Sequence, residues 1–243
     1  MRTLITGASS GLGAGMAREF SARGHDLALA ARRLDRLEAL RDELAPTGVR
    51  VAVAALDVDD HDAVFRTVRA LRDELGGLDR VIVNAGLGKG APIGTGRPDA
   101  NLATARTNFV SALAQCEAAM EIFRAQNAGH LVVVSSVAAD RGLAGAQTTY
   151  AATKAALSHL AEGIRVDVAD TPICVTTLAP GFIRTELNEG MSAPFAVDAV
   201  TGSRAMADAV ERAPAFAYVP TWPWSLLGRV LRVVPTPILR RVT

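Results

Sequence analysis

The chain lacks the features typical of secreted, membrane-spanning and nucleic-acid-binding proteins. Its two cysteines, Cys116 and Cys174, show no metal-ligand spacing, so we expect two buried free thiols and a reducing compartment. The N-terminal apolar run meets Gly7 too soon for a signal peptide, and no stretch holds the about 18 apolar residues of a membrane span. A net charge of +1 offers nucleic acid no basic surface. We therefore expect a soluble protein of the cytoplasm without a nucleic-acid partner.

Lysine and tyrosine are equally scarce. Among 26 lysines and arginines only Lys89 and Lys154 are lysine, and the chain has two tyrosines, Tyr150 and Tyr218. Nevertheless, one lysine follows one tyrosine by four positions, in the stretch TTYAATKAAL at 148–157. Positions four apart lie on the same face of a helix, so a phenol and an ammonium would share a small volume. This pairing indicates chemistry, although a pair alone is weak evidence.

Short apolar runs alternate along the chain with longer helical patterns. Strands are predicted at 2–6, 26–31, 50–56, 79–84, 130–136, 173–180 and 215–220. Helices are predicted at 12–23, 33–45, 60–75, 99–127 and 150–169, and 186–214 is a more irregular region. Regular alternation is typical of βαβ units and predicts an α/β fold, a Rossmann-type doubly wound parallel sheet with helices on both faces. The length and the 49% hydrophobic content suit one domain that spans residues 1–243.

The first predicted strand runs into a glycine-rich turn, TGASSGLG at 6–13. Glycine accepts positive φ angles and lets backbone N–H groups approach a pyrophosphate closely. The helix that begins near Leu12 would direct the positive end of its dipole at that anion. The spacing G-x3-G-x-G differs from the dinucleotide fingerprint G-x-G-x-x-G. Its place after the first strand of a βαβ series nevertheless favours phosphate binding over a plain turn.

Together with this loop, the chain resembles the short-chain dehydrogenase/reductase family from Thr6 to about Thr185. The family's motifs correspond in order to Thr6, Gly7, Gly11 and Gly13, to Asp57-Val58, Asn84-Ala85-Gly86, Asn108 and Ser136, to Tyr150 and Lys154, and to Pro180-Gly181 with Thr185. Each motif is weak by itself, but all of them in this order at the expected strand ends form a strong signal. The resemblance implies an oxidoreductase that interconverts a carbonyl and an alcohol with a nicotinamide cofactor.

The resemblance also implies which residues bind the cofactor. They are Thr6, Gly7, Ser9, Ser10, Gly11, Leu12, Gly13, Arg32, Arg33, Asp57, Val58, Asn84, Ala85, Gly86, Tyr150, Lys154, Pro180, Gly181, Ile183 and Thr185. Asp57 would lie beside the adenine, and Thr185 would bond the nicotinamide carboxamide unless it only caps a helix. Residues 1–185 would then form the cofactor-binding and catalytic core, and 186–243 the substrate-pocket region and C-terminal tail.

The end of the second predicted strand favours NADP over NAD. Enzymes of this architecture that prefer NAD carry an acidic residue there, which bonds the ribose hydroxyls. Here the strand ends in Ala30 and Ala31 and continues with Arg32 and Arg33. A guanidinium group clamps a 2′-phosphate through paired hydrogen bonds, and the resemblance makes Arg32 the first candidate. Asp35 nearby, and the alternative that these arginines only open a solvated helix, leave NAD as the second choice.

In the reaction that the resemblance implies, Tyr150 would act as the general acid for reduction and the general base for oxidation. A free phenol has a pKa near 10, so work near pH 7 requires a fall of about three units, or roughly 4 kcal/mol. A charge about 4 Å away supplies roughly 4 kcal/mol at an effective dielectric constant near 20. We therefore predict that the Lys154 ammonium lowers the pKa of Tyr150 and also contacts the cofactor ribose.

Two polar residues complete the predicted catalytic set. Ser136 would hydrogen-bond the substrate oxygen, and the resemblance implies that Asn108 holds a water linking Lys154 to solvent. Ser136 precedes Tyr150 by one residue more than is usual in the family, so a shifted loop or Ser135 is an alternative. The four histidines share no ligand spacing; we expect surface or loop positions and no metal for His25, His61, His130 and His159.

The tail contains tryptophan, proline and arginine. If 224–234 is a helix, one face holds Ser225, Gly228, Arg229 and Arg232, while Trp224, Leu227, Leu231 and Val234 lie elsewhere. Such a segment suits a pocket lid or a subunit interface, which we favour, or a peripheral membrane contact through 222–243. Alanine-rich helical segments at 103–120 and from 150 onward predict a homodimer or homotetramer.

The region after residue 185 also predicts the substrate class. Its apolar side chains, Phe195, Val197, Phe216, Trp222 and Trp224, favour a hydrophobic carbonyl or alcohol. The rival hypothesis is a protein that binds NADP(H) as a redox sensor or regulator without turnover. The complete set of Asn, Ser, Tyr and Lys argues against it, because a sensor needs no proton donor.

Overall fold

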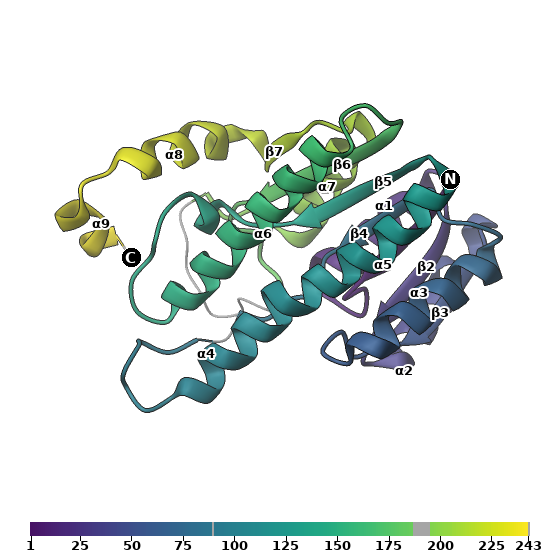
Figure 1. The fold of residues 1–243 in the computed structure, drawn as a ribbon, viewed down its shortest axis with the longest axis horizontal. Helices are drawn as coiled ribbons and strands as arrows, with labels where there is room; N and C mark the ends of the chain where they lie inside the picture. Colours follow the sequence, from purple (N-terminus) through teal and green to yellow (C-terminus); the bar gives the residue numbers. More distant parts are fainter. Residues whose placement is uncertain (89, 187–194, 243) are drawn as a thin grey trace.

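The computed structural model describes residues 1–88, 90–186 and 195–242. Its centre is a parallel sheet in the order β3-β2-β1-β4-β5-β6-β7 (Figure 1). The strands are β1 (Arg2–Thr6), β2 (Asp26–Ala31), β3 (Val51–Ala55), β4 (Arg80–Val83), β5 (Gly129–Val134), β6 (Ile173–Pro180) and β7 (Phe216–Val219). The strand order reverses between β1 and β4. In sheets of this kind, ligands bind in the crevice outside the carboxyl ends of the strands at such a reversal.

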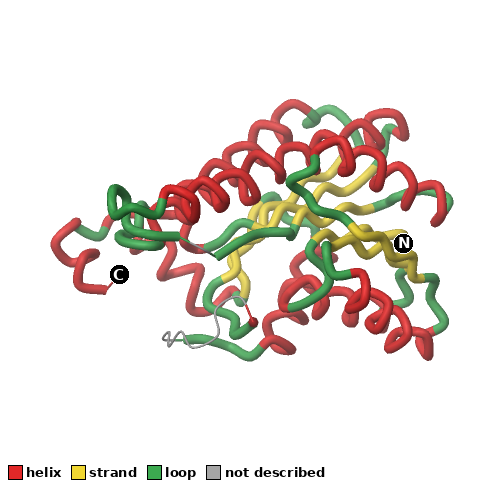
Figure 2. Tube along the Cα trace, turned by 90° about the horizontal axis from the view of Figure 1, so that it is seen from below, coloured by secondary structure: helices red, strands yellow, loops and turns green. Residues whose placement is uncertain are grey.

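Helices cover both faces of this sheet, as Figure 2 shows with the strands between two helical layers. In chain order the helical segments are α1 (Gly11–Ala22), α2 (Leu34–Leu44), η1 (Ala45–Thr47), α3 (His61–Leu75), α4 (Pro98–Ala105), η2 (Arg106–Val110), α5 (Ser111–Gln126), η3 (Val137–Asp140), α6 (Gln147–Asp167), α7 (Ala199–Arg212), α8 (Thr221–Val233) and α9 (Thr236–Val242). The predicted Rossmann-type doubly wound fold is confirmed.

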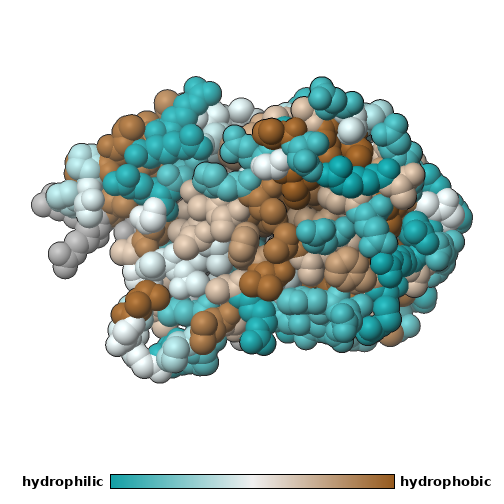
Figure 3. Space-filling view, in the orientation of Figure 1, coloured by the Kyte–Doolittle hydropathy of each residue, from teal (hydrophilic) through white to brown (hydrophobic). Residues whose placement is uncertain are grey.

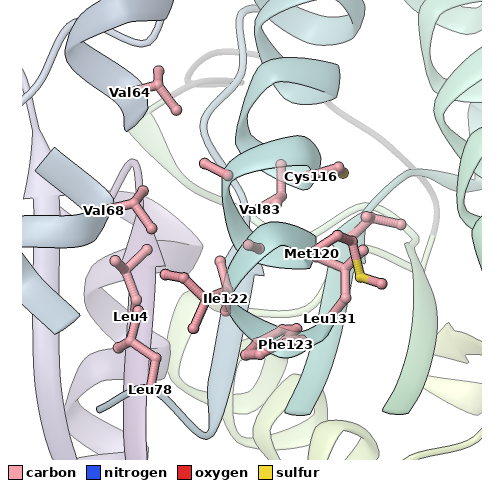
Figure 4. Packing of buried hydrophobic residues seen from close by; sticks show 14 of the residues in the cluster. Leu4, Val64, Val68, Leu78, Val83, Cys116, Met120, Ile122, Phe123 and Leu131 are labelled. Atoms are coloured by element: carbon pink, nitrogen blue, oxygen red, sulfur yellow. The ribbon is translucent and has the colours of Figure 1, made fainter. Parts of the chain in front are cut away.

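The sheet separates two hydrophobic cores, because alternate residues of a strand point to opposite faces. In β1, Leu4 belongs to the core beneath α3, α5 and α6, which Figure 4 shows from close by. Its neighbour Ile5 belongs to the core beneath α1, α2 and α7. Phe123 in the first core and Phe20 in the second are fully buried, and each such burial contributes about 1.5–3 kcal/mol. Both layers therefore hold the strand ends, and with them the crevice, in place.

One helix of the second layer, α7, lies where the sequence predicted an irregular region. Its amino end is capped by Asp198, whose carboxylate accepts a hydrogen bond from the Thr201 N–H at 2.8 Å. Met206 and Val210 are fully buried in the same core as α1. The prediction was wrong because several buried positions of α7 are Gly, Ser or Ala, and these small residues weaken the hydrophobic periodicity that indicates a helix.

The single helix predicted at 99–127 is interrupted. It consists of α4, the π-helical turn η2 and α5. A π turn inserts an extra residue into the helical ladder, and such turns occur frequently at functional sites. Asn108 lies within η2 and is completely buried. The interruption therefore changes the direction in which this predicted site residue points.

Two histidines and one cysteine also differ from expectation. His25 and His130 are buried rather than placed in loops or on the surface. His130 lies in β5 and accepts a hydrogen bond from Arg80 Nε at 3.1 Å, and burial lowers its pKa to about 4. Cys174 is exposed near the start of β6, whereas Cys116 is buried as expected, with a pKa that burial raises to about 12. Within the described ranges, no three His, Cys, Asp or Glu residues gather as metal ligands would.

The tail forms α8 and α9 at the end of the molecule beyond β7, at the left of Figure 1. The inner side of α8 carries Trp224 and Gly228, both buried, whereas Arg229 is exposed. Gly228 and Arg232 share one side of the helix as predicted, because Arg232 bonds Asp140 and a Cβ on Gly228 would lie 2.6 Å from the same carboxylate, beside the Tyr218 ring. Among the described residues, no helix is both long and apolar enough to traverse a lipid bilayer.

Candidate active site

A cleft of about 560 Å³ opens at the carboxyl edge of the sheet, where the strand order reverses. Pockets of about 300–1,000 Å³ suit small molecules and cofactors. Most of the predicted site residues line it: Gly7, Ser9, Ser10, Gly11, Leu12, Arg32, Arg33, Asp57, Val58, Asn84, Ala85, Gly86, Ser136, Tyr150, Lys154, Pro180, Gly181, Ile183 and Thr185. The sheet thus collects residues from across the chain at one edge.

The glycine-rich loop has the backbone shape that phosphate binding requires. Gly7 has a φ of 65°, and a Cβ there would lie 2.9 Å from Ala85 Cα. Gly11, with a φ of 53°, begins α1, so the amino end of that helix opens onto the cleft. The unpaired N–H groups and positive dipole end of a helix bind anions. A dinucleotide pyrophosphate fits this loop.

Three predicted residues lie beneath the cleft instead of lining it. Thr6 Oγ1 accepts hydrogen bonds from the N–H groups of Asn84 at 3.1 Å and Ala85 at 3.2 Å, so it ties β1 to β4. A Cβ on Gly13 would lie 2.4 Å from the Gly7 carbonyl oxygen, so Gly13 lets α1 pack against the loop. Asn108, the third residue that does not line the cleft, is buried in η2. Thr6 and Gly13 therefore shape the loop from below.

The two arginines after β2 differ in their contacts. Both line the cleft, and Arg32 is exposed. Arg33 donates hydrogen bonds to Ser9 Oγ at 3.1 Å and Ser10 Oγ at 2.7 Å. Its guanidinium therefore lies over the glycine-rich loop, and it is Arg33 rather than Arg32 that these contacts bring to the end of the cleft formed by that loop.

Ser136 and Tyr150 meet on the opposite side of the cleft. The Ser136 hydroxyl lies close enough to the Tyr150 phenol to lower its pKa, and it accepts a hydrogen bond from the Ala138 N–H at 3.1 Å. The phenol is surrounded by enough protein to lose most of its hydration, although the residue keeps some surface open to the cleft. Burial raises the pKa of Tyr150, and the Ser136 hydroxyl only partly opposes that rise.

Lys154 lies beneath Tyr150 with its ammonium held by the backbone. Its Nζ donates a hydrogen bond to the Val134 carbonyl at 2.8 Å and lies 5.8 Å from the centroid of the Tyr150 ring. Only 5% of the residue is exposed, and this burial lowers the pKa of Lys154 to about 8. The predicted lowering of the Tyr150 pKa by Lys154 is therefore not found in the chain by itself, because burial of the phenol is the largest cause of its shift and raises the pKa.

The geometry separates the two adjacent serines. Ser135 is buried and donates a hydrogen bond to the Lys154 carbonyl at 2.9 Å, and its Oγ lies 2.7 Å from Ser158 Oγ. Ser136 turns to the opposite side and meets Tyr150. The alternative that Ser135 replaces Ser136 in the site therefore has no geometric support, and the extra residue is accommodated between Ser136 and Tyr150.

Asn108 connects the π turn to the loop after β4. Its Oδ1 accepts a hydrogen bond from the Leu87 N–H at 2.6 Å, and its Nδ2 donates one to the Leu87 carbonyl at 2.8 Å. A Cβ on Gly86 would lie 3.2 Å from Asn108 Oδ1 and 3.7 Å from Lys154 Nζ. Asn108 thus lies close to Lys154 and holds the Gly86–Leu87 backbone; its predicted water-holding role stays a prediction.

The tail packs against Gly181, a residue of the cleft wall, through Trp224. Trp224 is buried, and a Cβ on Gly181 would lie 2.1 Å from its indole Nε1, so the ring covers Gly181. Of the other apolar residues predicted to form the pocket, Phe195, Phe216 and Trp222 are largely exposed, and Val197 packs into the core beneath α1. Trp224 is therefore the member of this set that the structure places against the cleft.

A second polar cluster fixes α8 near the site. Asp140, four residues after Ser136, accepts hydrogen bonds from Tyr218 Oη at 2.9 Å and from Arg232 Nη2 at 2.7 Å. Arg141 donates to the Arg232 and Val234 carbonyls, which lie at the end of α8. Burial and the Asp140 carboxylate raise the pKa of Tyr218 to about 12. This cluster joins the segment that carries Ser136 to the tail.

The cleft also contains residues that the sequence did not indicate. They are Leu56, Asp59, Leu87, Thr107, Val134 and Glu186, while Ala31 and Ser135, predicted only as a strand end and as an alternative to Ser136, line it as well. Nearly all directly adjoin a predicted residue, so extending each motif by one position would have found them. Glu186 follows Thr185 in this way, and its carboxylate forms ion pairs with Arg33 and Arg36.

Comparison with known proteins agrees with this geometry. A family model described as short chain dehydrogenase matches residues 2–194. An uncharacterized oxidoreductase of Mycobacterium tuberculosis is 50% identical over 243 residues, which cover 99% of this chain and 96% of that protein. Among solved structures, the NADPH-dependent 3-quinuclidinone reductase of Rhodotorula rubra is 27% identical with a TM-score of 0.79, over 87% of this chain and 83% of that one. A serine dehydrogenase complexed with NADP+ is 25% identical with a TM-score of 0.78, over 90% and 94%.

These matches cover most of the chain, and they coincide with the glycine-rich loop and the Ser136, Tyr150 and Lys154 group at the edge of the sheet. The fold is the NAD(P)-binding Rossmann fold of the matched proteins. On both grounds, the chain is an oxidoreductase that belongs to the short chain dehydrogenase family.

Proposed function

We propose that the protein is an NADP(H)-dependent oxidoreductase that interconverts a ketone or aldehyde with the corresponding alcohol. The observation that carries this proposal is the meeting of Ser136 with Tyr150 above the buried ammonium of Lys154, inside the cleft that begins at the phosphate loop. When bound, the nicotinamide supplies the hydride that the carbonyl carbon gains. The remaining chemistry belongs to the side chains of this cleft.

The protonation states of the site suit carbonyl reduction. Burial keeps the Tyr150 phenol protonated at neutral pH, so its Oη is able to give a proton to the carbonyl oxygen. Ser136 Oγ lies beside that phenol and stabilises the negative charge that develops on the same oxygen. Lys154, with a pKa of about 8, is mostly charged at pH 7 and compensates the charge left on Tyr150 after the transfer. Asn108 supports this arrangement through the Gly86–Leu87 backbone.

The preference for NADP rests on the cations after β2. Arg33 lies over Ser9 and Ser10, and Arg32 borders the same part of the cleft. Guanidinium groups bind a phosphate in paired hydrogen bonds. Two structural neighbours, an NADPH-dependent reductase and a dehydrogenase complexed with NADP+, support the same choice. We therefore place the 2′-phosphate near Arg32 and Arg33.

An apolar substrate is proposed from the side chains near Tyr150. Leu87 lines the cleft, and Trp224 covers Gly181 at its rim. Apolar walls with a few placed polar groups are typical of small-molecule sites. The expected substrates are hydrophobic ketones, aldehydes and secondary alcohols.

A panel of carbonyl compounds tests both parts of the proposal. We expect NADPH oxidation, followed at the nicotinamide absorbance, with hydrophobic ketones or aldehydes and slower oxidation of NADH. Turnover of sugars alone would contradict the apolar substrate, and faster turnover with NADH would contradict the cofactor preference. Tight NADPH binding without turnover of any compound would instead support a regulatory protein.

We also propose that the protein is a homodimer or homotetramer assembled through the α5 and α6 layer. Val110 and Val166 expose apolar side chains on this layer, beside many alanines. Small residues allow helices to approach closely across an interface. Sedimentation equilibrium should give a multiple of the 25.4 kDa chain, and Val166→Asp should shift it toward the monomer. A wild-type monomer at all concentrations would end this proposal.

The outer face of α8 carries a further proposal, contact with an anionic membrane. Leu226, Val230 and Val233 follow one another at helical spacing, Trp222 precedes them with a non-helical backbone, and all four are 45–78% exposed. Figure 3 shows hydrophobic side chains beside hydrophilic ones at this end of the molecule. From Thr221 onward the sequence contains arginines but no acidic residue, so two paired tails would repel each other whereas anionic lipid would attract them.

Flotation with vesicles tests this contact. The protein should float with phosphatidylcholine vesicles that contain phosphatidylglycerol, and Leu226→Asp should abolish flotation. Val200→Asp, which changes an exposed apolar residue on α7, is the matched control and should float like the wild type. Wild-type protein that remains at the bottom of the gradient would rule the contact out.

A further inference from the structure

The mouth of the cleft is crossed by one carboxylate. Glu186 Oε1 and Oε2 each accept a hydrogen bond from Arg36 Nη1 at 3.0 Å, and Oε2 lies 3.6 Å from Arg33 Nη1. Arg33 is the residue that also reaches Ser9 and Ser10 of the phosphate loop. A single acidic side chain is therefore shared by two arginines, one of which also contacts that loop.

The bridge joins two sides of the cleft. Arg33 precedes α2 and Arg36 lies in its first turn, on the side of β2. Glu186 follows Thr185, whose side chain approaches Gly11: a Cβ added to that glycine would lie 3.4 Å from Thr185 Cβ. Glu186 lines the cleft itself. Its carboxylate therefore occupies donor groups that point at the region between the phosphate loop and α2.

The Glu186 carboxylate and a bound phosphate would compete for the same guanidinium groups. A guanidinium donates hydrogen bonds equally well to a carboxylate and to a phosphate, and an N–H group that is bonded to the carboxylate is not available to the phosphate. About half of each side chain in the bridge is exposed, so the ion pairs are weak and exchange with solvent. A dianionic phosphate displaces the carboxylate from such a pair. While the carboxylate stays nearby, its negative charge also repels the phosphate.

We infer that Glu186 is a specificity-determining residue, a competitor within the chain for the arginines that bind the 2′-phosphate. Its effect is to weaken the binding of NADP(H) without affecting NAD(H), which has no phosphate at that position. The inference rests on the proposed preference for NADP. It adds that the preference is smaller than the three neighbouring arginines alone would produce.

Glu186→Gln tests the inference because it keeps the shape of the side chain and removes its charge. Dissociation constants of NADPH and NADH are measured without substrate, from the change in cofactor fluorescence on binding. We expect NADPH to bind roughly three- to tenfold more tightly to E186Q at low salt, with NADH unchanged. The gain should shrink at high salt, because these groups are exposed and their charges are screened.

Two further variants make the comparison specific. Glu43→Gln is the matched control: Glu43 pairs with Arg18 through two hydrogen bonds, at 2.7 and 2.8 Å, and is similarly exposed. E43Q should leave both dissociation constants unchanged. In an Arg36→Gln background, the effect of E186Q should be smaller than in the wild type, because one of the two contested guanidinium groups is gone.

The outcomes separate this inference from the proposed function. Wild-type protein that binds NADPH more tightly than NADH, with E186Q unchanged, would overturn the role of Glu186 and leave the cofactor preference standing. Weaker NADPH binding by E186Q would show that the carboxylate orients the arginines, and equal gains for both cofactors would show a merely wider cleft; either result overturns the inference. Wild-type protein that binds NADH at least as tightly as NADPH would overturn both.

Discussion

The two tyrosines of the chain lie in clusters that contain similar groups in different arrangements. Tyr150 meets a serine hydroxyl above the buried ammonium of Lys154, and no carboxylate contributes to its pKa shift among the described residues. Tyr218 Oη donates a hydrogen bond to the carboxylate of Asp140, which also accepts one from the Arg232 guanidinium. Both phenols have raised pKa values, but for different reasons. Burial acts almost alone on Tyr150, whereas Tyr218 is also bound to a negative charge.

This difference separates a phenol that is able to exchange its proton from one that is not. The proton of Tyr218 is committed to Asp140, and releasing it would leave two negative charges in contact. The Tyr150 hydroxyl opens on the cleft and has a neighbouring cation to compensate the phenolate. The Tyr150 cluster is therefore suited to proton transfer, and the Tyr218 cluster is suited to holding α8 against η3.

The largest expected difference between the two clusters is in turnover. Tyr150→Phe should lower kcat by about 10³-fold or more, because the general acid is lost. Its binding of NADPH and its unfolding free energy should stay close to wild type. Steady-state kinetics with a hydrophobic ketone provide the measurement, and turnover that survives in Tyr150→Phe would remove the basis for assigning the cleft its chemistry.

Lys154 should affect stability in a direction that depends on pH. Its folded pKa of about 8 lies below the unfolded value of 10.5, so the folded chain loses its proton first as pH rises. Cofactor-free protein should therefore gain stability between about pH 8 and pH 10.5, and Lys154→Met should remove that slope. At pH 7 this variant should be more stable by up to about 3 kcal/mol, while its turnover is lost.

Urea unfolding at a series of pH values measures this effect. Tyr218 provides a built-in contrast, since its folded pKa of about 12 lies above the unfolded value of 10.0 and its contribution to stability is lost as pH rises from 10 to 12. The wild-type profile should therefore rise and then fall. A flat wild-type profile between pH 8 and 10 would contradict the burial of a charged Lys154.

Adjacent serines allow a smaller but sharper comparison. Ser136→Ala should lower kcat by about 10²-fold, because the hydroxyl that faces Tyr150 is lost. Ser135→Ala should keep turnover and lower the unfolding free energy by about 1 kcal/mol, since its hydroxyl bonds the Lys154 carbonyl inside the protein. Steady-state kinetics and urea unfolding of both variants show which serine supports turnover and which supports stability. A larger loss of kcat in Ser135→Ala would reverse the assignment.

The smallest expected effect concerns Tyr218. Tyr218→Phe removes one hydrogen bond to Asp140 and leaves the ion pair with Arg232 in place. We expect a loss of about 1 kcal/mol in unfolding free energy and turnover close to that of the wild type. Thermal unfolding and steady-state kinetics test this expectation. If Tyr218→Phe lost as much turnover as Tyr150→Phe, the division between a catalytic and a structural tyrosine would be wrong.

Sequence patterns predicted the strands well because the residues that end each strand are its direct neighbours in the sequence. β1, β2 and β6 have the predicted bounds, and β1 ends at the start of a glycine turn. The cleft residues follow from the same logic, since parallel strands deliver their carboxyl ends to one edge. A motif identifies which residue stands at the end of a strand. The fold then determines where in the cleft that residue lies.

Long-range contacts were not predictable in this way. The bond between Tyr218 and Asp140 joins positions far apart in sequence, and neither position lies in a recognisable motif. The ion pairs of Glu186 with Arg33 and Arg36 have the same character. The sign of the Tyr150 pKa shift was missed because a single charge at an assumed distance was considered and the cost of burial was not.

The core beneath α1 extends past the residues that the family model matches. The family model stops at residue 194, yet Met206 and Val210 are fully buried, and a Cβ on Gly15 would lie 1.9 Å from Ser203 Oγ. α7 therefore closes the hydrophobic core against which α1, the helix after the glycine-rich loop, packs. Chimeras that exchange substrate regions between relatives should place their junction after β7, because a seam at 194 would pair one parent's α1 with another parent's α7.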